Sequence, residues 1–185
     1  FGQDFAGLGG DAQYVRTRAR GRAFFGFFDD DVVASAEIEG GYIQNFGDDL
    51  KITDRFFLGG DRFRGFATSG LGPRDRTTDD ALGGNAFVVQ RTEVSFPIGL
   101  PEEFGFFGGV FHDVGSLWRL DTTSVTNDAG ETFTVDDGLE LRAAAGVSLF
   151  WDSAFGPLRV NLAYPYLKED GDDEEYFRLT AGTRF

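Results

Sequence analysis

Long stretches of this 185-residue sequence alternate apolar and polar side chains, the pattern of β-strands with two unlike faces. The alternation is clearest near the end of the chain, where every second residue is apolar from 139 to 151 and again from 158 to 166. Stretches rich in glycine and aspartate separate the regular segments. The sequence therefore predicts an all-β chain with seven strands, at 11–28, 32–43, 85–98, 104–118, 139–151, 158–166 and 177–185.

Most of these segments reach the roughly 9–11 residues that a tilted strand needs to cross a bilayer, whereas soluble strands average about 5–6. Their connections are alternately short and long. This pattern is typical of outer-membrane barrels, which have short periplasmic turns and long extracellular loops. We therefore predict an antiparallel transmembrane β-barrel, with a lipocalin-like soluble barrel as the alternative. A chain end at Phe185 implies that the last strand runs toward the periplasm and finishes at the periplasmic face. The short connections are 29–31, 99–103 and 153–156, and the long ones are 44–84, 119–138 and 168–175.

Composition excludes several functions. The 31 acidic and 17 basic residues give a net charge of −14, which argues against nucleic acid as a partner. The absence of cysteine excludes disulfides, zinc–thiolate sites and thiol nucleophiles. The acidic residues at 170–175 lack the spacing of a calcium loop, so we predict a solvated loop, no metal and no cofactor.

The single histidine, His112, does not predict an enzyme. It stands beside Asp113 and near Ser116, but neighbouring residues of a strand point to opposite faces, which is awkward for a catalytic triad. We interpret His112 as an aromatic-girdle residue at a strand end.

Four arginines share one face of the first predicted strand: Arg16, Arg18, Arg20 and Arg22. Such a row is hard to bury in an apolar core and favours a barrel lumen. Carboxylates on the next strand, such as Glu37 and Glu39, are expected to balance it. An anion-selective porin is the competing interpretation.

Three segments resemble the BamA family, which folds and inserts β-barrel proteins into the outer membrane of Gram-negative bacteria. DRFFLGGDRFRGFATSGLGPRD at 54–75 is similar to the family's sixth extracellular loop, and Arg64-Gly65-Phe66 matches its motif. FHDVGSLW at 111–118 resembles the thirteenth strand, and the residues from 156 to the end resemble the last two strands.

The resemblance implies that residues 1–185 are the C-terminal half of a sixteen-stranded barrel that follows periplasmic POTRA domains. The seven predicted strands would be the tenth to the sixteenth, and residues 1–10 the end of the preceding strand or its loop. The loop at about 44–84 is expected to fold into the lumen. There, the resemblance implies, Arg64 meets Glu93 and Asp113.

The resemblance also implies a role for the last strand, whose weak pairing with the first strand would open sideways as a gate. The residues concerned are Phe177, Leu179, Gly182 and Phe185, which also resemble the C-terminal signal of barrel proteins. The implied partners are the outer-membrane bilayer, nascent outer-membrane proteins and accessory assembly lipoproteins. The chain alone, with two open edges, is expected to self-associate.

Other functions stay open at the level of sequence. TamA-type translocation subunits and two-partner secretion transporters share the Arg-Gly-Phe motif and the barrel. A soluble or surface β-domain that binds other proteins is the alternative outside transport.

Overall fold

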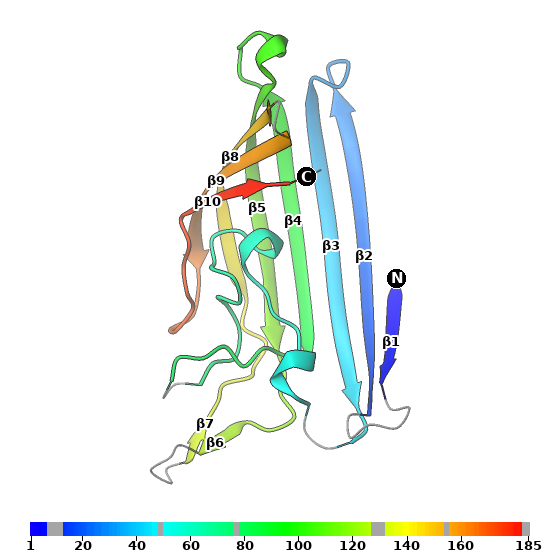
Figure 1. The fold of residues 1–185 in the computed structure, drawn as a ribbon, viewed down its shortest axis with the longest axis vertical. Helices are drawn as coiled ribbons and strands as arrows, with labels where there is room; N and C mark the ends of the chain where they lie inside the picture. The colour runs from blue at the N-terminus through cyan, green and yellow to red at the C-terminus, as the bar shows by residue number, and fades with distance from the viewer. Residues whose placement is uncertain (7–12, 48–49, 76–77, 127–131, 154–155, 183–185) are drawn as a thin grey trace.

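A computed structural model describes residues 1–6, 13–47, 50–75, 78–126, 132–153 and 156–182. They form an open, eight-stranded antiparallel sheet in which each strand pairs with its neighbours in the order β1-β2-β3-β4-β5-β8-β9-β10 (Figure 1). The all-β antiparallel prediction is confirmed. The strands are β1 (Gly2–Ala6), β2 (Tyr14–Phe27), β3 (Val32–Asn45), β4 (Ala86–Pro97), β5 (Phe106–Trp118), β8 (Arg142–Ser153), β9 (Gly156–Leu167) and β10 (Phe177–Ala181).

The seven predicted strands correspond to β2–β5 and β8–β10, with ends that differ by a few residues. β1 lies in the stretch that we assigned to the end of a preceding strand or its loop, and it pairs with β2 from Gly2↔Arg18 to Ala6↔Tyr14. Phe185 lies outside the described residues. Among the described helices, which are short 3-10 turns, none is long and apolar enough to cross a membrane.

A small hairpin inside the connection between β5 and β8 was not predicted. Its strands are β6 (Ser124–Thr126) and β7 (Thr132–Thr134), which pair only with each other. Three residues are too few for an alternating pattern to be recognised, although threonine and valine favour strands.

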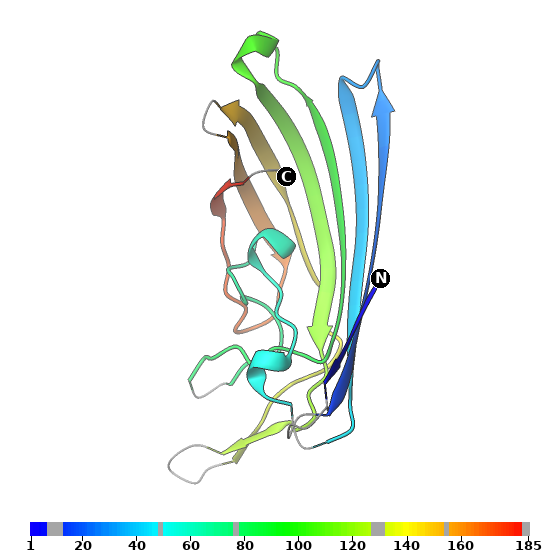
Figure 2. The same ribbon diagram turned by 45° about the vertical axis from the view of Figure 1, so that its right-hand side comes forward.

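The sheet is curved (Figure 2). Its two faces differ in the side chains that they carry. The outer face carries exposed apolar side chains, including Ile38, Val110, Val147, Leu162 and Leu179, as a lipid-facing wall requires. The inner face carries the charged residues that alternate with them. β5 departs from this rule, because Phe111 shares the inner face with Asp113, and both are buried.

The long connection between β3 and β4 lies in the hollow of the sheet (Figure 2). Two 3-10 turns, η1 (Ile52–Asp54) and η2 (Gly60–Arg62), shape it. We call residues 50–75 and 78–84 of this connection the plug loop. Its apolar side chains form one core with the inner face of the sheet: Phe56, Leu58, Phe63, Phe66 and Leu71 pack with Ile43, Phe87, Val89, Leu117 and Ala144. Burial of this apolar core fixes the loop against the wall.

Candidate functional site: an arginine of the plug loop held by the wall

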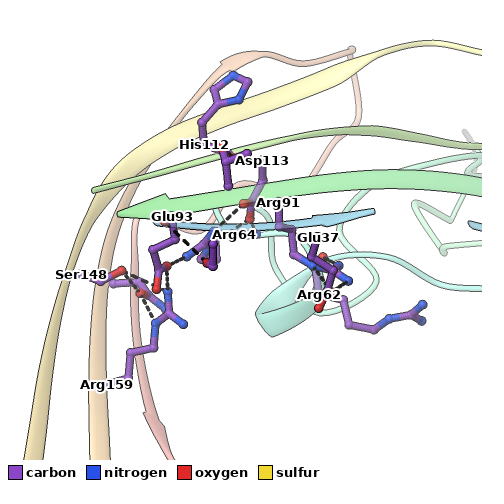
Figure 3. Close-up of polar contacts among 12 residues, drawn as sticks. Glu37, Arg62, Arg64, Arg91, Glu93, His112, Asp113, Ser148 and Arg159 are labelled. Carbon is purple, nitrogen blue, oxygen red and sulfur yellow. Dashed lines mark hydrogen bonds and ion pairs between the residues drawn. The ribbon is translucent and has the colours of Figure 1, made fainter. Parts of the chain in front are cut away.

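Arg64 points from the plug loop into the sheet and meets two carboxylates (Figure 3). Its Nε donates to Asp113 Oδ2 at 2.8 Å and its Nη2 to Asp113 Oδ1 at 2.5 Å. Its backbone N–H also donates to Asp113 Oδ2, at 3.0 Å, and its Nη1 donates to Glu93. The planar guanidinium suits this paired arrangement, which fixes the loop in position as well as in charge.

This contact lies away from water. Asp113 is fully buried and Arg64 is only 6% exposed. Burial alone lowers the pKa of the Arg64 guanidinium, but the hydrogen bonds and charge of Asp113, together with the charge of Glu93, raise that pKa above its ordinary value. Arg64 therefore stays charged at any pH that the protein meets. Arg64 therefore contributes a fixed positive charge to this contact.

A second arginine completes the cluster. Arg159 on β9 donates to Glu93, and its Nε donates to Asn161 Oδ1 at 2.8 Å (Figure 3). Ser148 on β8 accepts from Arg159 Nη2 at 3.1 Å and donates to Asn161 at 2.8 Å. Two arginines thus face two carboxylates, so the cluster carries no net charge. We refer to Arg64, Glu93, Asp113 and Arg159 as the plug lock.

The aromatic residues around the lock explain the irregular pattern of β5. The Arg64 guanidinium lies over the Phe111 ring, 3.7 Å from its centroid, which is a cation–π contact. Phe66 of the motif is fully buried against Phe63, with ring centroids 5.3 Å apart. Phe111 interrupts the apolar–polar alternation of β5 because its ring faces inward and contacts the Arg64 guanidinium.

Gly65 allows the loop to approach the wall. Its φ is +92°, a conformation that glycine adopts readily, and a Cβ built there would lie 2.7 Å from the Ala144 Cβ. Even alanine at position 65 would therefore push the loop away from β8.

We expect Gly65→Ala to destabilise the full-length protein by about 1–3 kcal/mol more than Gly99→Ala, because overcrowding a packed site costs about that much. Gly99 is a matched control, since its φ is +81° and nothing lies within 4 Å of a Cβ at that position. The measurement is the unfolding midpoint of both variants in detergent. Equal midpoints would show that the loop does not need this close approach.

A second charged cluster holds the plug loop nearer β2. Glu37 is 5% exposed and accepts from Arg20, Arg22 and Arg91. Glu39 accepts from Arg91 at 2.6 Å and from Arg62 of the plug loop at 3.0 Å. The pairing of the arginine row with carboxylates of the next strand was predicted, whereas the parts played by Arg62 and Arg91 were not.

The remaining predicted residues lie apart from the lock. Phe177 and Leu179 are more than half exposed on the outer face of β10. Gly182 follows the end of β10, and its N–H donates to the Pro157 carbonyl at 3.2 Å. Arg159 was not among the predicted site residues, although its alternation with Leu158 and Val160 is a signal that places it on the inner face.

Two predictions are wrong in their details. His112 lies in the middle of β5 rather than at a strand end, and its Nε2 is 2.6 Å from the Tyr166 hydroxyl. It points away from Asp113, as strand geometry requires (Figure 3). Asp172 of the acidic loop is not solvated, because its side chain is 1% exposed and pairs with Arg142 at 3.0 Å.

The fold and the site together define a class. A curved antiparallel wall, apolar outside and charged inside, with a loop locked onto its inner face, is part of a plugged β-barrel of the outer-membrane type. The domain of the Omp85 superfamily matches residues 1–185, so the chain belongs to that superfamily.

Individual relatives agree with this placement. The chain is 39% identical over 173 residues to the outer membrane protein assembly factor BamA of Neorickettsia risticii, a match that covers 93% of this chain and 22% of that protein. It is 31% identical over 151 residues to the sorting assembly machinery 50 kDa subunit of Saccharomyces cerevisiae, covering 78% of this chain and 30% of that protein.

A solved structure gives the same result. The crystal structure of BamA from Haemophilus ducreyi lacking POTRA domains 1–3 matches with a TM-score of 0.75 and 26% identity, over 93% of this chain and 35% of that one. The predicted resemblance to the C-terminal part of a BamA-family barrel is thereby confirmed. The chain spans between about a fifth and a third of the length of these relatives.

Proposed function

We propose that this chain is the plug-bearing wall of an outer-membrane assembly factor, which folds β-barrel proteins and inserts them into the outer membrane of a Gram-negative bacterium. The observation that carries the proposal is the plug lock, in which Arg64 of an Arg-Gly-Phe segment is held by Glu93 and Asp113 on the inner face of the sheet. The names of the relatives support the same activity. Assembly of this kind involves no covalent chemistry.

β10 supplies the proposed gate. It is the last strand of the sheet, so one of its edges has no neighbour among the described strands. The unpaired N–H and C=O groups of such an edge can template an incoming strand by β-augmentation. Phe177, Leu179 and Ala181 face outward, where an apolar incoming strand would continue the lipid-facing surface.

The proposal includes the partners. The bilayer contacts the apolar outer face, nascent outer-membrane proteins pair with β10, and accessory lipoproteins bind the complete protein. Nucleic acid is not proposed as a partner, because the net charge is −14. Isolated residues 1–185 are expected to self-associate through their sheet edges, since an exposed edge pairs readily with another copy.

The direct test is depletion and rescue. Cells depleted of their own assembly factor should recover outer-membrane protein assembly when the full-length gene that contains this chain is expressed. The amount of folded, heat-modifiable barrel protein in the outer membrane is the readout. Full expression at the outer membrane without any recovery would contradict the proposed function.

Ion conductance separates this proposal from a passive porin. The plug loop fills the hollow of the sheet, and Glu37 pairs with Arg20 and Arg22 of the arginine row. We therefore expect the full-length protein in planar bilayers to be closed most of the time. A steady open conductance with anion selectivity would favour the porin.

A further inference from the structure

The described part of β10 pairs with one strand only, β9, in the described sheet. It pairs with β9 over five residues, from Phe177↔Leu162 to Ala181↔Leu158, whereas the register of β8 with β9 runs from Ala143 to Ser153. Among the described residues of β10, alternation places two side chains on the inner face, Arg178 and Thr180. The contacts of Arg178 and Thr180 therefore determine how strongly groups in the lumen restrain β10.

Both inner side chains of β10 bond to the plug loop. Thr180 Oγ1 lies 2.8 Å from Asp61 Oδ1, and the hydroxyl donates to the carboxylate. Arg178 Nη2 donates to Thr68 Oγ1 at 3.3 Å. Asp61 and Thr68 lie on either side of the Arg-Gly-Phe segment, so the loop that carries Arg64 touches the last strand at two points.

The backbone makes a second connection. Gly65 O accepts from the N–H of Glu175 at 3.0 Å, and the Glu175 carboxylate accepts from Arg178 Nε at 2.8 Å. A neighbouring backbone hydrogen bond runs from Ala67 N–H to Asp173 O, at 2.9 Å. Residues 65–67 thus pair with the segment that leads into β10, and the motif itself is joined to the strand through Glu175.

We propose that the plug loop is a strap on the last strand, with Asp61 and Thr68 as positioning residues that restrain β10 against β9. The physical reason is that a strand at the edge of a sheet opens at lower cost than an inner strand, so hydrogen bonds from a loop fixed by a buried core and an ion-pair cluster add to its restraint. Release of the strap would be required before β10 can leave β9 or accept a new partner. Only this last statement rests on the proposed function.

The strap can be removed from the loop side without changing β10. Asp61 and Thr68 are both exposed, so Asp61→Ala with Thr68→Val leaves the core of the loop intact. The matched control is Asp80→Ala with Thr78→Val, the same substitutions at exposed positions of the same loop. Both double variants are made in the full-length protein.

Hydrogen exchange measures the restraint. We expect the β10 amides of the strap variant to exchange about tenfold faster than those of the wild type, since two hydrogen bonds of ordinary net strength are lost. Exchange in β5 around Asp113 should not change, because the plug lock is untouched. The control variant should match the wild type. Unchanged exchange in β10 of the strap variant would overturn the strap.

A reversible cross-link tests the consequence for assembly. These 185 residues contain no cysteine, so Asp61→Cys with Thr180→Cys adds a single pair to this part of the protein, which oxidation or a short bis-thiol reagent can join. The joined form should lose rescue of outer-membrane assembly and regain it on reduction. Full rescue by the joined form would overturn the requirement for release. Failure of the wild type to rescue, with the exchange difference present, would instead contradict the proposed function and leave the strap standing.

Discussion

Replacing Asp113 with alanine in the full-length protein is expected to detach the plug loop from the wall. Asp113 is fully buried and accepts from the backbone N–H, Nε and Nη2 of Arg64. Removing one member of a buried ion pair strands the other charge and costs about 3–5 kcal/mol. Glu93 keeps only the contact to Nη1, so it cannot replace the lost pairing.

Limited proteolysis reports this detachment directly. The plug loop holds trypsin sites at Lys51, Arg55, Arg62, Arg64 and Arg74, and Arg64 is buried against the wall, so a detached loop offers trypsin more accessible backbone than a fixed one. We expect cleavage within the loop to be much faster in Asp113→Ala than in the wild type. Asp80→Ala, which removes an exposed carboxylate of the same loop, is the control and should be cut at the wild-type rate. A slow, wild-type rate in Asp113→Ala would mean that the apolar core alone holds the loop.

Reversing the charge at position 64 is expected to have the largest effect of any single change. Arg64→Glu turns the plug lock from two arginines and two carboxylates into one arginine and three carboxylates, so its net charge falls from 0 to −2. Like charges at a buried site repel strongly because water screens them poorly. The Arg64→Glu substitution also removes the cation–π contact between Arg64 and Phe111. We expect faster cleavage than in Asp113→Ala and a low level of folded protein.

A compensating change should restore part of this loss, and the two possible partners should differ. Glu93 is the more accessible, with 16% of its side chain exposed, so Arg fits there more easily than at the fully buried Asp113. However, Glu93→Arg also places a cation beside Arg159, which now pairs with Glu93. Neither swap reproduces the bidentate contact of Arg64 with Asp113. Rescue in either double variant is therefore expected to be partial.

The strands were predictable because their chemistry is local. Period-two alternation in the predicted strand at 85–98 puts Arg91 and Glu93 on one face and Val94 on the other, which matches the sheet. The β6–β7 hairpin was too short to show a pattern. β5 was the least regular strand because Phe111 and Asp113 both serve the plug loop, and a residue that packs against a distant loop does not follow the rule of an apolar outer face.

The site was predictable only through the resemblance. Nothing in the period or composition says that a loop folds back into a barrel, so Arg64 could not be matched to Glu93 and Asp113 from the residues alone. The wider network was missed for the same reason, because Arg62 contacts Glu39, and Arg178 contacts Thr68, across long separations in sequence. Only the inner-face positions of Glu39 and Arg178, which lie on strands, were available from the pattern.

Assembly rescue by charge-swap variants tests most directly whether the plug lock is required for function. Full-length Arg64→Glu, Arg64→Glu with Glu93→Arg, and Arg64→Glu with Asp113→Arg are expressed at equal levels in cells depleted of their own assembly factor, and folded outer-membrane protein is measured. The single variant should fail, and at least one double variant should recover part of the wild-type level. Normal assembly by Arg64→Glu alone would contradict the role proposed for the lock.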